Sequence, residues 1–217
     1  LNTGNRLWFE GAAALDAPGE WARAANGTLL YLPREGESPQ STAVMVPAAP
    51  YVVHLLNANN VSFSSLSFAD ADFVRNGFQA GFNIEASSPG IPDDAALQLS
   101  GVSNVTVQAC TFAQLATGGV LITNSSSDVV VTECVFSHVG QSGVIMTGND
   151  STQPHDVTVS GCSIAGVGEV LASAGGIFGS SVSSSVFQGN TIRNGSRWGI
   201  AIRSNDGPHA MSLNNVI

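Results

Sequence analysis

Apolar and polar residues alternate with a period of two in several short segments that align with one another without gaps. These segments are residues 60–68, 104–112, 128–136, 156–164 and 184–192. Their second, fourth and ninth positions are mostly Val, Phe or Ile, whereas the third and eighth positions are mostly polar or small. This alternation predicts β-strands with one buried and one exposed face. The sequence shows no helical periodicity of useful length.

The spacing of the segments predicts a solenoid. Successive segments begin 44, 24, 28 and 28 residues apart, which is a unit of about two dozen residues with insertions. If equivalent strands stack in parallel about 4.8 Å apart, each position becomes a ladder of like side chains. A further apolar segment opens with Gly119, Gly143, Gly176 or Gly199 in successive units. We expect two or three short strands per coil, with these glycines providing the backbone freedom that a sharp corner needs.

The seventh position of the repeat holds all three cysteines, in the order Leu66, Cys110, Cys134, Cys162 and Asn190. Neighbouring sulfurs would lie about one strand spacing apart, which is too long for a disulfide unless the side chains rotate toward each other. Zinc ligands favour tight turns, and no His accompanies these cysteines. We predict buried free thiols, no metal and no cofactor. We also expect Asn190 to begin a ladder of hydrogen-bonded amides.

The first fifty residues do not follow the repeat. Residues 15–21 contain a Pro-Gly turn and residues 27–33 an apolar segment, which together predict a short strand pair. We therefore predict an N-terminal β cap or lead-in over residues 1–50 and a parallel β-helix of about five coils over residues 51–217. The sequence lacks an initiating Met and ends in a strand-like segment, so we expect both ends to be fragment boundaries.

Charge and hydropathy exclude two classes of partner. The formal net charge is −9, and all seven basic residues are Arg. No basic patch is available to displace counterions from a nucleic acid, so a nucleic acid partner is disfavoured. No segment approaches the roughly 18 apolar residues that span a bilayer. The sequence does not specify an oligomeric state.

Several segments carry a resemblance to a known family. They are residues 15–21 (LDAPGEW), 28–33 (TLLYLP), 96–99 (ALQL), 138–143 (HVGQSG), 196–200 (SRWGI) and 214–217 (NNVI). The sequence resembles the right-handed β-helix repeat family of the pectin-lyase-like superfamily, and in particular its secreted group that includes some glycoside hydrolases. The resemblance covers essentially the whole chain. It implies an all-β, right-handed parallel β-helix, a secreted or cell-surface location, and a polysaccharide or oligosaccharide partner.

The same resemblance limits the chemistry. Polygalacturonase-like hydrolases carry Asn-Thr-Asp, Asp-Asp, Gly-His-Gly and Arg-Ile-Lys blocks, of which only an isolated Asp93-Asp94 occurs here, within an insertion. Pectate lyases use Ca²⁺-binding acids and a basic proton acceptor, for which this chain could offer only an Arg. Neither activity is supported. Two classes stay open, a glycoside hydrolase-like enzyme and a non-catalytic sugar-binding or surface module.

Candidate catalytic residues come from the insertions, which commonly build the binding face of a solenoid. The insertions fall at about residues 69–95, 148–155, 166–174 and 205–213. Hydrolysis of a glycoside needs two carboxyl groups about 5–10 Å apart. The candidates are Glu169, Asp206 and Asp150, with Asp156 also considered. Asp150 and Asp206 follow equivalent strands two coils apart, about 10 Å if they point the same way, and Glu169 lies between them in an extra insertion.

Candidate substrate-binding residues are Trp198, Arg197, Arg203, His209 and His138. A Trp offers a stacking face for a sugar ring, and an Arg offers a fork of donors for hydroxyls or a carboxylate. Structural interpretations remain open beside these. The acids would be solvated turn residues, Arg197 would stack on Trp198 at a corner of the coil, and His138 would cap backbone carbonyls.

Overall fold

The computed structural model describes residues 11–38, 40–73, 94–149, 151–204, 212 and 214–217. The chain divides into two compact units, Leu1–Met45 and Val46–Ile217. The first unit contains a 3₁₀ turn, η1 (Ala12–Ala14), and an antiparallel strand pair, β1 (Trp21–Arg23) and β2 (Leu29–Tyr31). The strand pair predicted from the Pro-Gly turn is therefore present. Its role as a cap of the solenoid stays a prediction.

The second unit is built from three parallel sheets. Sheet I contains β3 (Val53–Leu56), β6 (Ala95–Ser100), β9 (Gly118–Thr123), β12 (Val144–Thr147), β15 (Gly175–Ser180) and β18 (Trp198–Arg203). Sheet II contains β4 (Asn59–Ser64), β7 (Ser103–Gln108), β10 (Ser127–Thr132), β13 (His155–Ser160) and β16 (Val186–Gln188). Sheet III contains β5 (Ser67–Ala69), β8 (Thr111–Leu115), β11 (Val135–Val139), β14 (Ser163–Val167) and β17 (Thr191–Arg193).

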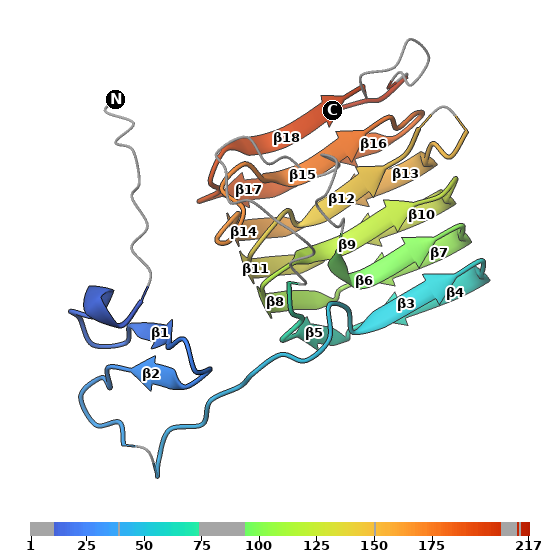
Figure 1. Ribbon diagram of the computed structural model, residues 1–217. Coiled ribbons are helices and arrows are strands. Elements are labelled where there is room, and N and C mark those ends of the chain that lie inside the picture. The colour runs from blue at the N-terminus through green and yellow to red at the C-terminus, as the bar shows by residue number, and fades with distance from the viewer. Residues whose placement is uncertain (1–10, 39, 74–93, 150, 205–211, 213) are drawn as a thin grey trace, which may run out of the picture. The chain divides into compact units, whose positions relative to one another are not determined.

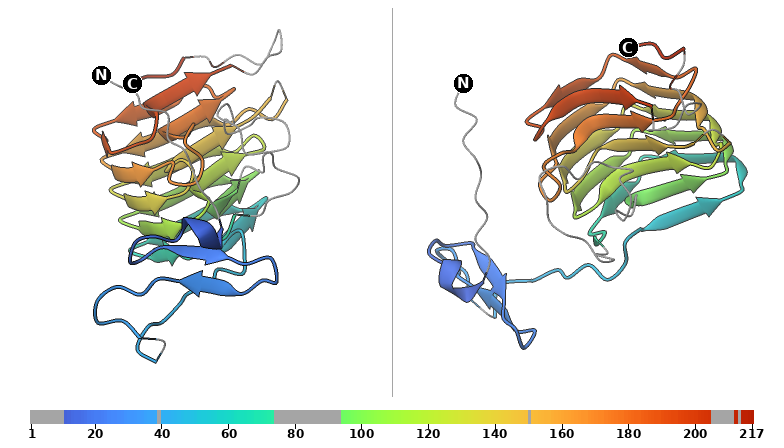
Figure 2. Two further views of the ribbon diagram at one scale, coloured as in Figure 1. Left: turned by 60° about the vertical axis from the view of Figure 1, so that its left-hand side comes forward. Right: turned by 45° about the horizontal axis from the view of Figure 1, so that its top comes forward.

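The chain visits sheets I, II and III in turn, so three consecutive strands make one coil. Each strand pairs in parallel with the equivalent strand of the next coil, and the coils stack in chain order along one axis (Figures 1 and 2). Five coils are complete from β3 to β17, and β18 begins the next. The predicted parallel β-helix of about five coils is confirmed. Among the described residues no helix is long and apolar enough to cross a membrane.

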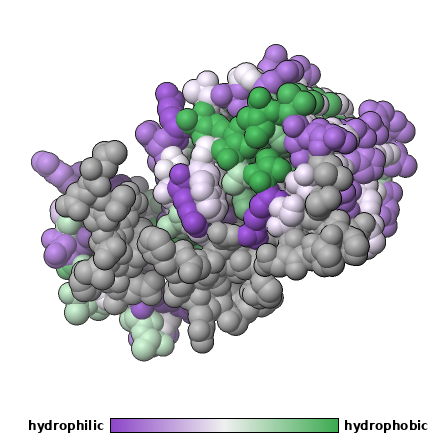
Figure 3. All heavy atoms as spheres, turned by 90° about the horizontal axis from the view of Figure 1, so that it is seen from above, coloured by the Kyte–Doolittle hydropathy of each residue, from purple (hydrophilic) through white to green (hydrophobic). Residues whose placement is uncertain are grey.

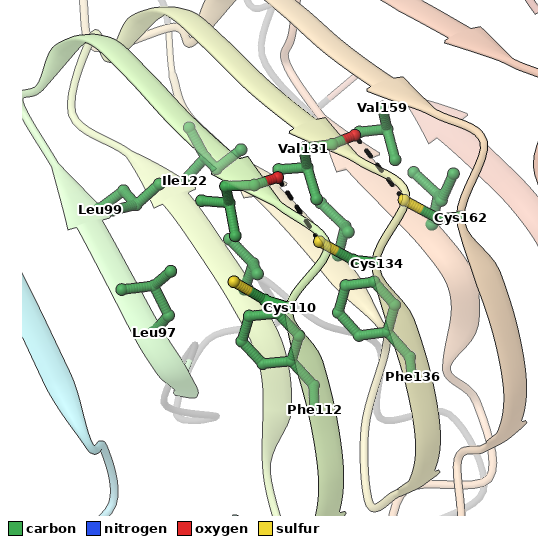
Figure 4. Packing of buried hydrophobic residues seen from close by; sticks show 14 of the residues in the cluster. Leu97, Leu99, Cys110, Phe112, Ile122, Val131, Cys134, Phe136, Val159 and Cys162 are labelled. Carbon is green, nitrogen blue, oxygen red and sulfur yellow. Dashed lines mark hydrogen bonds between the residues drawn. The ribbon is translucent and has the colours of Figure 1, made fainter. Parts of the chain in front are cut away.

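The core consists of the ladders that the repeat predicts. Val105, Val129 and Val157 stand in register on neighbouring coils, and each is fully buried. The rings of Phe112 and Phe136 stack almost parallel, with centroids 4.8 Å apart and planes 7° apart (Figure 4). Centroids near one strand spacing bring like side chains into van der Waals contact along the axis. Seen from the β18 end, where several Ile residues are only partly buried, apolar atoms gather in one patch (Figure 3).

The cysteines are free and buried on three consecutive coils, as predicted. Each thiol lies within hydrogen-bond reach of a backbone carbonyl of the preceding coil, Cys134 Sγ at 3.5 Å from Val107 O and Cys162 Sγ at 3.7 Å from Val131 O (Figure 4). Burial raises the pKa of the Cys110 thiol. A hydrogen bond with Cys162, and then burial, raise the pKa of Cys134. Thiols with raised pKa values stay protonated and unreactive near neutral pH.

Asn190 bonds to the backbone of the preceding coil, and the amide ladder expected to begin at it stays a prediction. Its Nδ2 donates to Val159 O at 2.8 Å, and its Oδ1 accepts from Cys162 N at 3.0 Å. Both partners are backbone groups of the preceding coil. An Asn suits this position because its amide can donate to the carbonyl and accept from the N–H at the same corner. An amide contact along the axis occurs elsewhere, where Asn104 Nδ2 donates to Asn60 Oδ1 at 2.7 Å.

The corners are turned by residues in the left-handed region, and these are not the glycines that the sequence suggested. The first repeat position has φ between 50° and 60° at Asn60, Asn104, Asp128, Asp156 and Ser184. Asn and Asp tolerate this conformation better than other non-glycine residues. The glycines that open the sheet I segments, Gly119, Gly143, Gly176 and Gly199, are absent from the positive-φ glycines. Corner flexibility is therefore the wrong explanation for them.

Close packing explains these glycines instead. A Cβ on Gly119 would lie 2.5 Å from Gly143 O and 2.6 Å from the Phe136 ring. A Cβ on Gly176 would lie 2.6 Å from Ile192 Cγ2. The backbone of each coil thus presses directly on the ladder of the ninth position. Of these four glycines, only Gly199, in β18, has open space around its Cβ position.

We predict that Val131→Asp destabilises the protein by several kcal/mol, because it buries an unpaired carboxylate in the core. Val131 is fully buried. The matched control is Val130→Asp, one residue earlier on β10, which lies in the outward-facing row with Thr106 and Thr158. We expect the control to change the free energy of unfolding by about 1 kcal/mol or less. Urea unfolding measures both, and equal losses would contradict the assignment of inward and outward rows.

We further predict that Gly119→Ala destabilises the protein by about 1–3 kcal/mol through overpacking. Gly199→Ala should be neutral or slightly stabilising, because its Cβ meets nothing within 4 Å and the substitution reduces the entropy of the unfolded chain. Thermal unfolding of the two variants compares them directly. If Gly199→Ala lost as much stability as Gly119→Ala, close packing would not explain these glycines, and a need for backbone freedom at the corner would again be the better explanation.

Candidate functional site

Four of the candidate residues lie along one edge of the solenoid, where the chain passes from sheet III to sheet I. We call residues 138–143, 166–174 and 194–198 the III–I edge. These three segments belong to consecutive coils. The first two begin in the last two residues of β11 and β14, and the third follows β17. His138, Glu169, Arg197 and Trp198 all lie on this edge. The repeat brings them together although they are up to 60 residues apart in sequence.

His138 faces solvent from a left-handed backbone conformation. Its φ is 52°, and it interrupts the pairing of β11 between Ser137, which pairs with Ala165, and Val139, which pairs with Val167. The imidazole Nδ1 lies 2.9 Å from Glu169 Oε1, with 70% of the His side chain and 48% of the Glu side chain exposed. The ring therefore pairs with a carboxylate, and the expected role as a cap of backbone carbonyls is not what the structure shows.

The extra residues of the fourth coil place Glu169 beside His138. The turn that follows β14 folds back on the preceding coil, with Gly168 N donating to both Val139 O and Gln141 O at 2.9 Å. Val170 N and Leu171 N donate to Gly140 O at 3.0 and 2.8 Å. Gly168 has φ 78°, a conformation that favours glycine. This backbone anchoring fixes the position of a half-exposed carboxylate at the edge.

Arg197 and Trp198 form a stacked pair on the next coil. The Arg197 guanidinium carbon lies 3.8 Å from the centroid of the Trp198 ring, a cation–π arrangement. Trp198 begins β18 in register with Gly175 and is partly buried. The stacking of Arg197 on Trp198 that we considered as a structural role is thus present. Because the guanidinium occupies one face of the indole, only the other face is left to contact a sugar ring.

Arg203 lies away from this group. It ends β18, five residues beyond Trp198, which places the two about 17 Å apart along an extended strand. Its guanidinium carbon lies 5.2 Å from the Phe178 ring centroid. The candidate residues are therefore divided between the two ends of the sheet I strands. Asp150, Asp206 and His209 lie outside the described residues.

A second pair of acidic residues consists of Asp156, which was considered as a candidate acid, and Asp128, which was not selected from the sequence. Asp128 and Asp156 hold the first repeat position on neighbouring coils, and both are exposed. His155 Nδ1 lies 2.7 Å from Asp156 Oδ2, and Ser127 Oγ lies 3.1 Å from Asp128 Oδ2. Their left-handed φ values, 51° and 54°, account for Asp at these corners without a functional role. Among the described residues no group of three His, Cys, Asp or Glu could hold a metal ion.

The outward side of sheet I is also unusual, because its central row is apolar and buried. Leu121, Ile145 and Phe178 stand in register on three coils, at 4%, 0% and 1% exposure. They form a cluster with Ala95, separate from the main core. This cluster was not predicted, because a Gly followed by three apolar residues is equally typical of a strand that is buried on its inner side alone.

Comparisons with known proteins agree with this architecture. Residues 95–217 match the family described as "Right handed beta helix region". A solved structure titled "Glycoside hydrolase" is similar with a TM-score of 0.72 at 18% sequence identity, over 89% of this chain and 40% of that chain. The chain thus spans less than half of the length of that structure, and the likeness concerns the fold. No curated protein sequence matches the chain.

Proposed function

Because the chain belongs to the right-handed β-helix family, we propose that it is an extracellular carbohydrate-active protein that binds a polysaccharide or oligosaccharide along the III–I edge. The observation that carries the proposal is the His138–Glu169 pair, with its 2.9 Å contact, next to the Arg197–Trp198 stack on the following coil. Consecutive coils repeat this edge along the axis. A linear glycan is likewise a long ligand with a repeat, so one chain of sugars can contact several coils at once.

The chemistry that we propose is glycoside hydrolysis with Glu169 as the acid–base residue. Such a residue must be reachable by the glycosidic oxygen and oriented by a neighbour. Glu169 meets both needs, because about half of its side chain is exposed and His138 holds one of its oxygens. The Trp198 indole would pack on a sugar ring, and Arg197 would donate hydrogen bonds to its hydroxyls.

A glycosidase needs a second carboxyl group. We propose Asp206 first and Asp150 second for this role. Both follow the carboxyl ends of sheet I strands, whereas Glu169 precedes such a strand, so the role requires the insertions that carry these acids to reach the III–I edge. Arg203 and His209, close to Asp206 in sequence, would position the substrate or the acid. The net charge of −9 favours neutral or weakly acidic glycans, because a strongly anionic polymer would be repelled.

A non-catalytic sugar-binding or surface module is the second candidate. One observation favours it: within the three segments of the III–I edge, Glu169 is the only carboxylate. If neither Asp206 nor Asp150 approaches Glu169, the edge can bind a glycan without cleaving it. The two candidates share the same surface and differ in turnover.

We predict that Glu169→Gln lowers hydrolysis of the bound glycan by about 10²–10⁴-fold, the usual contribution of an acid–base residue. The amide keeps a polar partner for His138, so the melting temperature should change little. The matched control is Glu133→Gln, an exposed Glu whose carboxylate accepts from Gln108 on sheet II. The substrates to be tested are neutral β-1,4-linked hexasaccharides and an oligouronate. Hydrolysis is measured as the rate at which new reducing ends are released.

Equal turnover by Glu169→Gln, Glu133→Gln and the unaltered protein would reject Glu169 as the acid–base residue. Binding of a hexasaccharide without turnover would favour the sugar-binding module. Failure of every sugar to bind would reject the carbohydrate-active function.

A further inference from the structure

One edge of the solenoid carries an N-glycosylation sequon on each of four consecutive coils. The sequon is Asn-X-Ser or Asn-X-Thr, where X is any residue but Pro. The four sites lie where the chain passes from sheet I to sheet II, in residues 57–60, 101–104, 124–127 and 148–149, which we call the I–II edge. Their spacings of 44, 20 and 25 residues give no sign of this alignment, which the coils produce. The sites are Asn60, Asn104, Asn124 and Asn149.

Backbone conformation explains only part of this row. Asn60, Asn104 and Asn124 have φ values of 60°, 50° and 54°, a left-handed conformation that Asn tolerates. Asn149 is not among the described residues with a positive φ. The conformation also makes no demand on the second residue after each Asn, which is Ser or Thr at all four sites. The row therefore calls for a further explanation.

Three of the four amides are placed so that they can carry a sugar. Asn60, Asn104 and Asn149 are exposed. Asn104 Nδ2 donates to Asn60 Oδ1 at 2.7 Å, and a substituted amide nitrogen keeps one N–H for such a bond. Asn149 Oδ1 accepts from the N and the Oγ of Ser151, at 3.0 Å each. These contacts engage the oxygen of Asn149 and not the nitrogen that would be modified.

Asn124 is the exception in this row. Its Nδ2 donates to Oγ of Ser100 at 2.7 Å, and Ser100 is only 6% exposed. A sugar on this nitrogen would lie against a buried part of the corner. The hydroxyl of its sequon, on the buried Ser126, already accepts from Val102 N and donates to Thr123 O. Ser126 thus has a structural role, and Asn124 is not a candidate for modification.

We propose that the I–II edge bears N-linked oligosaccharides at Asn60, Asn104 and Asn149. This inference rests on the extracellular location in the proposed function, because the sugar is transferred during secretion. The donor is an oligosaccharide carried on a lipid diphosphate. The Asn Nδ2 forms a bond to C1 of the first sugar while the bond between C1 and the diphosphate breaks. The diphosphate leaves with the bonding electrons, and the amide nitrogen gives up one proton.

Sugars on this edge would leave the III–I edge accessible. N-linked sugars are bulky and solubilising, so they belong on a surface that no ligand covers. The strands of sheet I separate the two edges, and β9, from Gly118 to Thr123, is about 17 Å long. A sugar on Asn149 would also favour Asp206 over the neighbouring Asp150 as the second carboxyl group. The two remaining sequons, at Asn26 and Asn194, lie in the first unit and on the III–I edge.

The test is mass spectrometry of peptides from the protein secreted by its natural source. A glycosidase that converts each sugar-bearing Asn to Asp in heavy-oxygen water labels the modified sites. We expect the label at Asn60, Asn104 and Asn149. Two or more bare sites among these three would overturn the proposal, and so would a sugar at Asn194 beside a bare I–II edge.

A variant secreted from a eukaryotic host tests one site by itself. Thr106→Val removes the sequon of Asn104 and keeps the Asn, and Val already occupies the same outward row at Val130 and Val186. We expect complete loss of the sugar at Asn104 and no loss at Asn60 or Asn149. The matched control is Thr158→Val in the same row, which follows Asp156 and belongs to no sequon, so all three sites should stay modified. Thr106→Ala serves the same purpose if Thr106→Val is poorly secreted.

Enzymatic removal of the sugars from the folded protein tests their placement. We expect the affinity for the neutral hexasaccharide to stay unchanged, because the sugars and the ligand occupy different edges. A large change in this affinity would overturn the placement of the sugars away from the binding surface. Modified sites on a protein that binds no hexasaccharide would support this inference and reject the proposed function, so the two proposals can fail separately.

Discussion

The stacking of each coil on the one before it is the interaction on which the rest of the molecule depends. Parallel pairing sets the spacing between coils at about 4.8 Å, and that spacing brings like side chains of neighbouring coils against one another. The Phe112 and Phe136 rings stack 4.8 Å apart for this reason. Gly119 and Gly176 follow from the same constraint, because a side chain there would strike the ladder it rests on.

Since the ladders fix the strands, variation is confined to the edges. The corners accept insertions because their backbone can leave the sheet and return in register. The turn of residues 168–174 is one such insertion, and it brings a carboxylate to an edge where His138 already projects. The scaffold thereby places polar groups of three consecutive coils on one edge, as the proposed binding of a linear glycan requires.

The fold could be predicted from the sequence because each inward position repeats its own chemistry. Val at the second position and Cys at the seventh gave both the register and the buried free thiols. The role of the glycines that open the sheet I segments could not be predicted in this way. A left-handed backbone conformation and close packing against a neighbouring side chain both favour Gly. The partners of Asn190 were missed likewise, since the backbone groups that it satisfies leave no mark in the sequence.

The candidate site was only partly predictable. Insertions and residue types were enough to select Glu169, His138, Arg197 and Trp198. The pairing of His138 with Glu169 depends on how a turn folds across a coil boundary, and these residues are 31 positions apart. Arg203 was selected for its nearness to Asp206 in sequence, yet it ends β18 about 17 Å from Trp198 along the extended strand.

The most direct measurement of the central claim is a crystal structure of Glu169→Gln bound to the neutral hexasaccharide. Removing the acid–base residue should preserve the bound sugar while leaving the surface otherwise intact. The account predicts a sugar chain along the III–I edge, with rings in contact with Trp198 and within hydrogen-bond distance of position 169. A sugar chain bound on the outer faces of sheets II and III, away from His138 and Trp198, would contradict it.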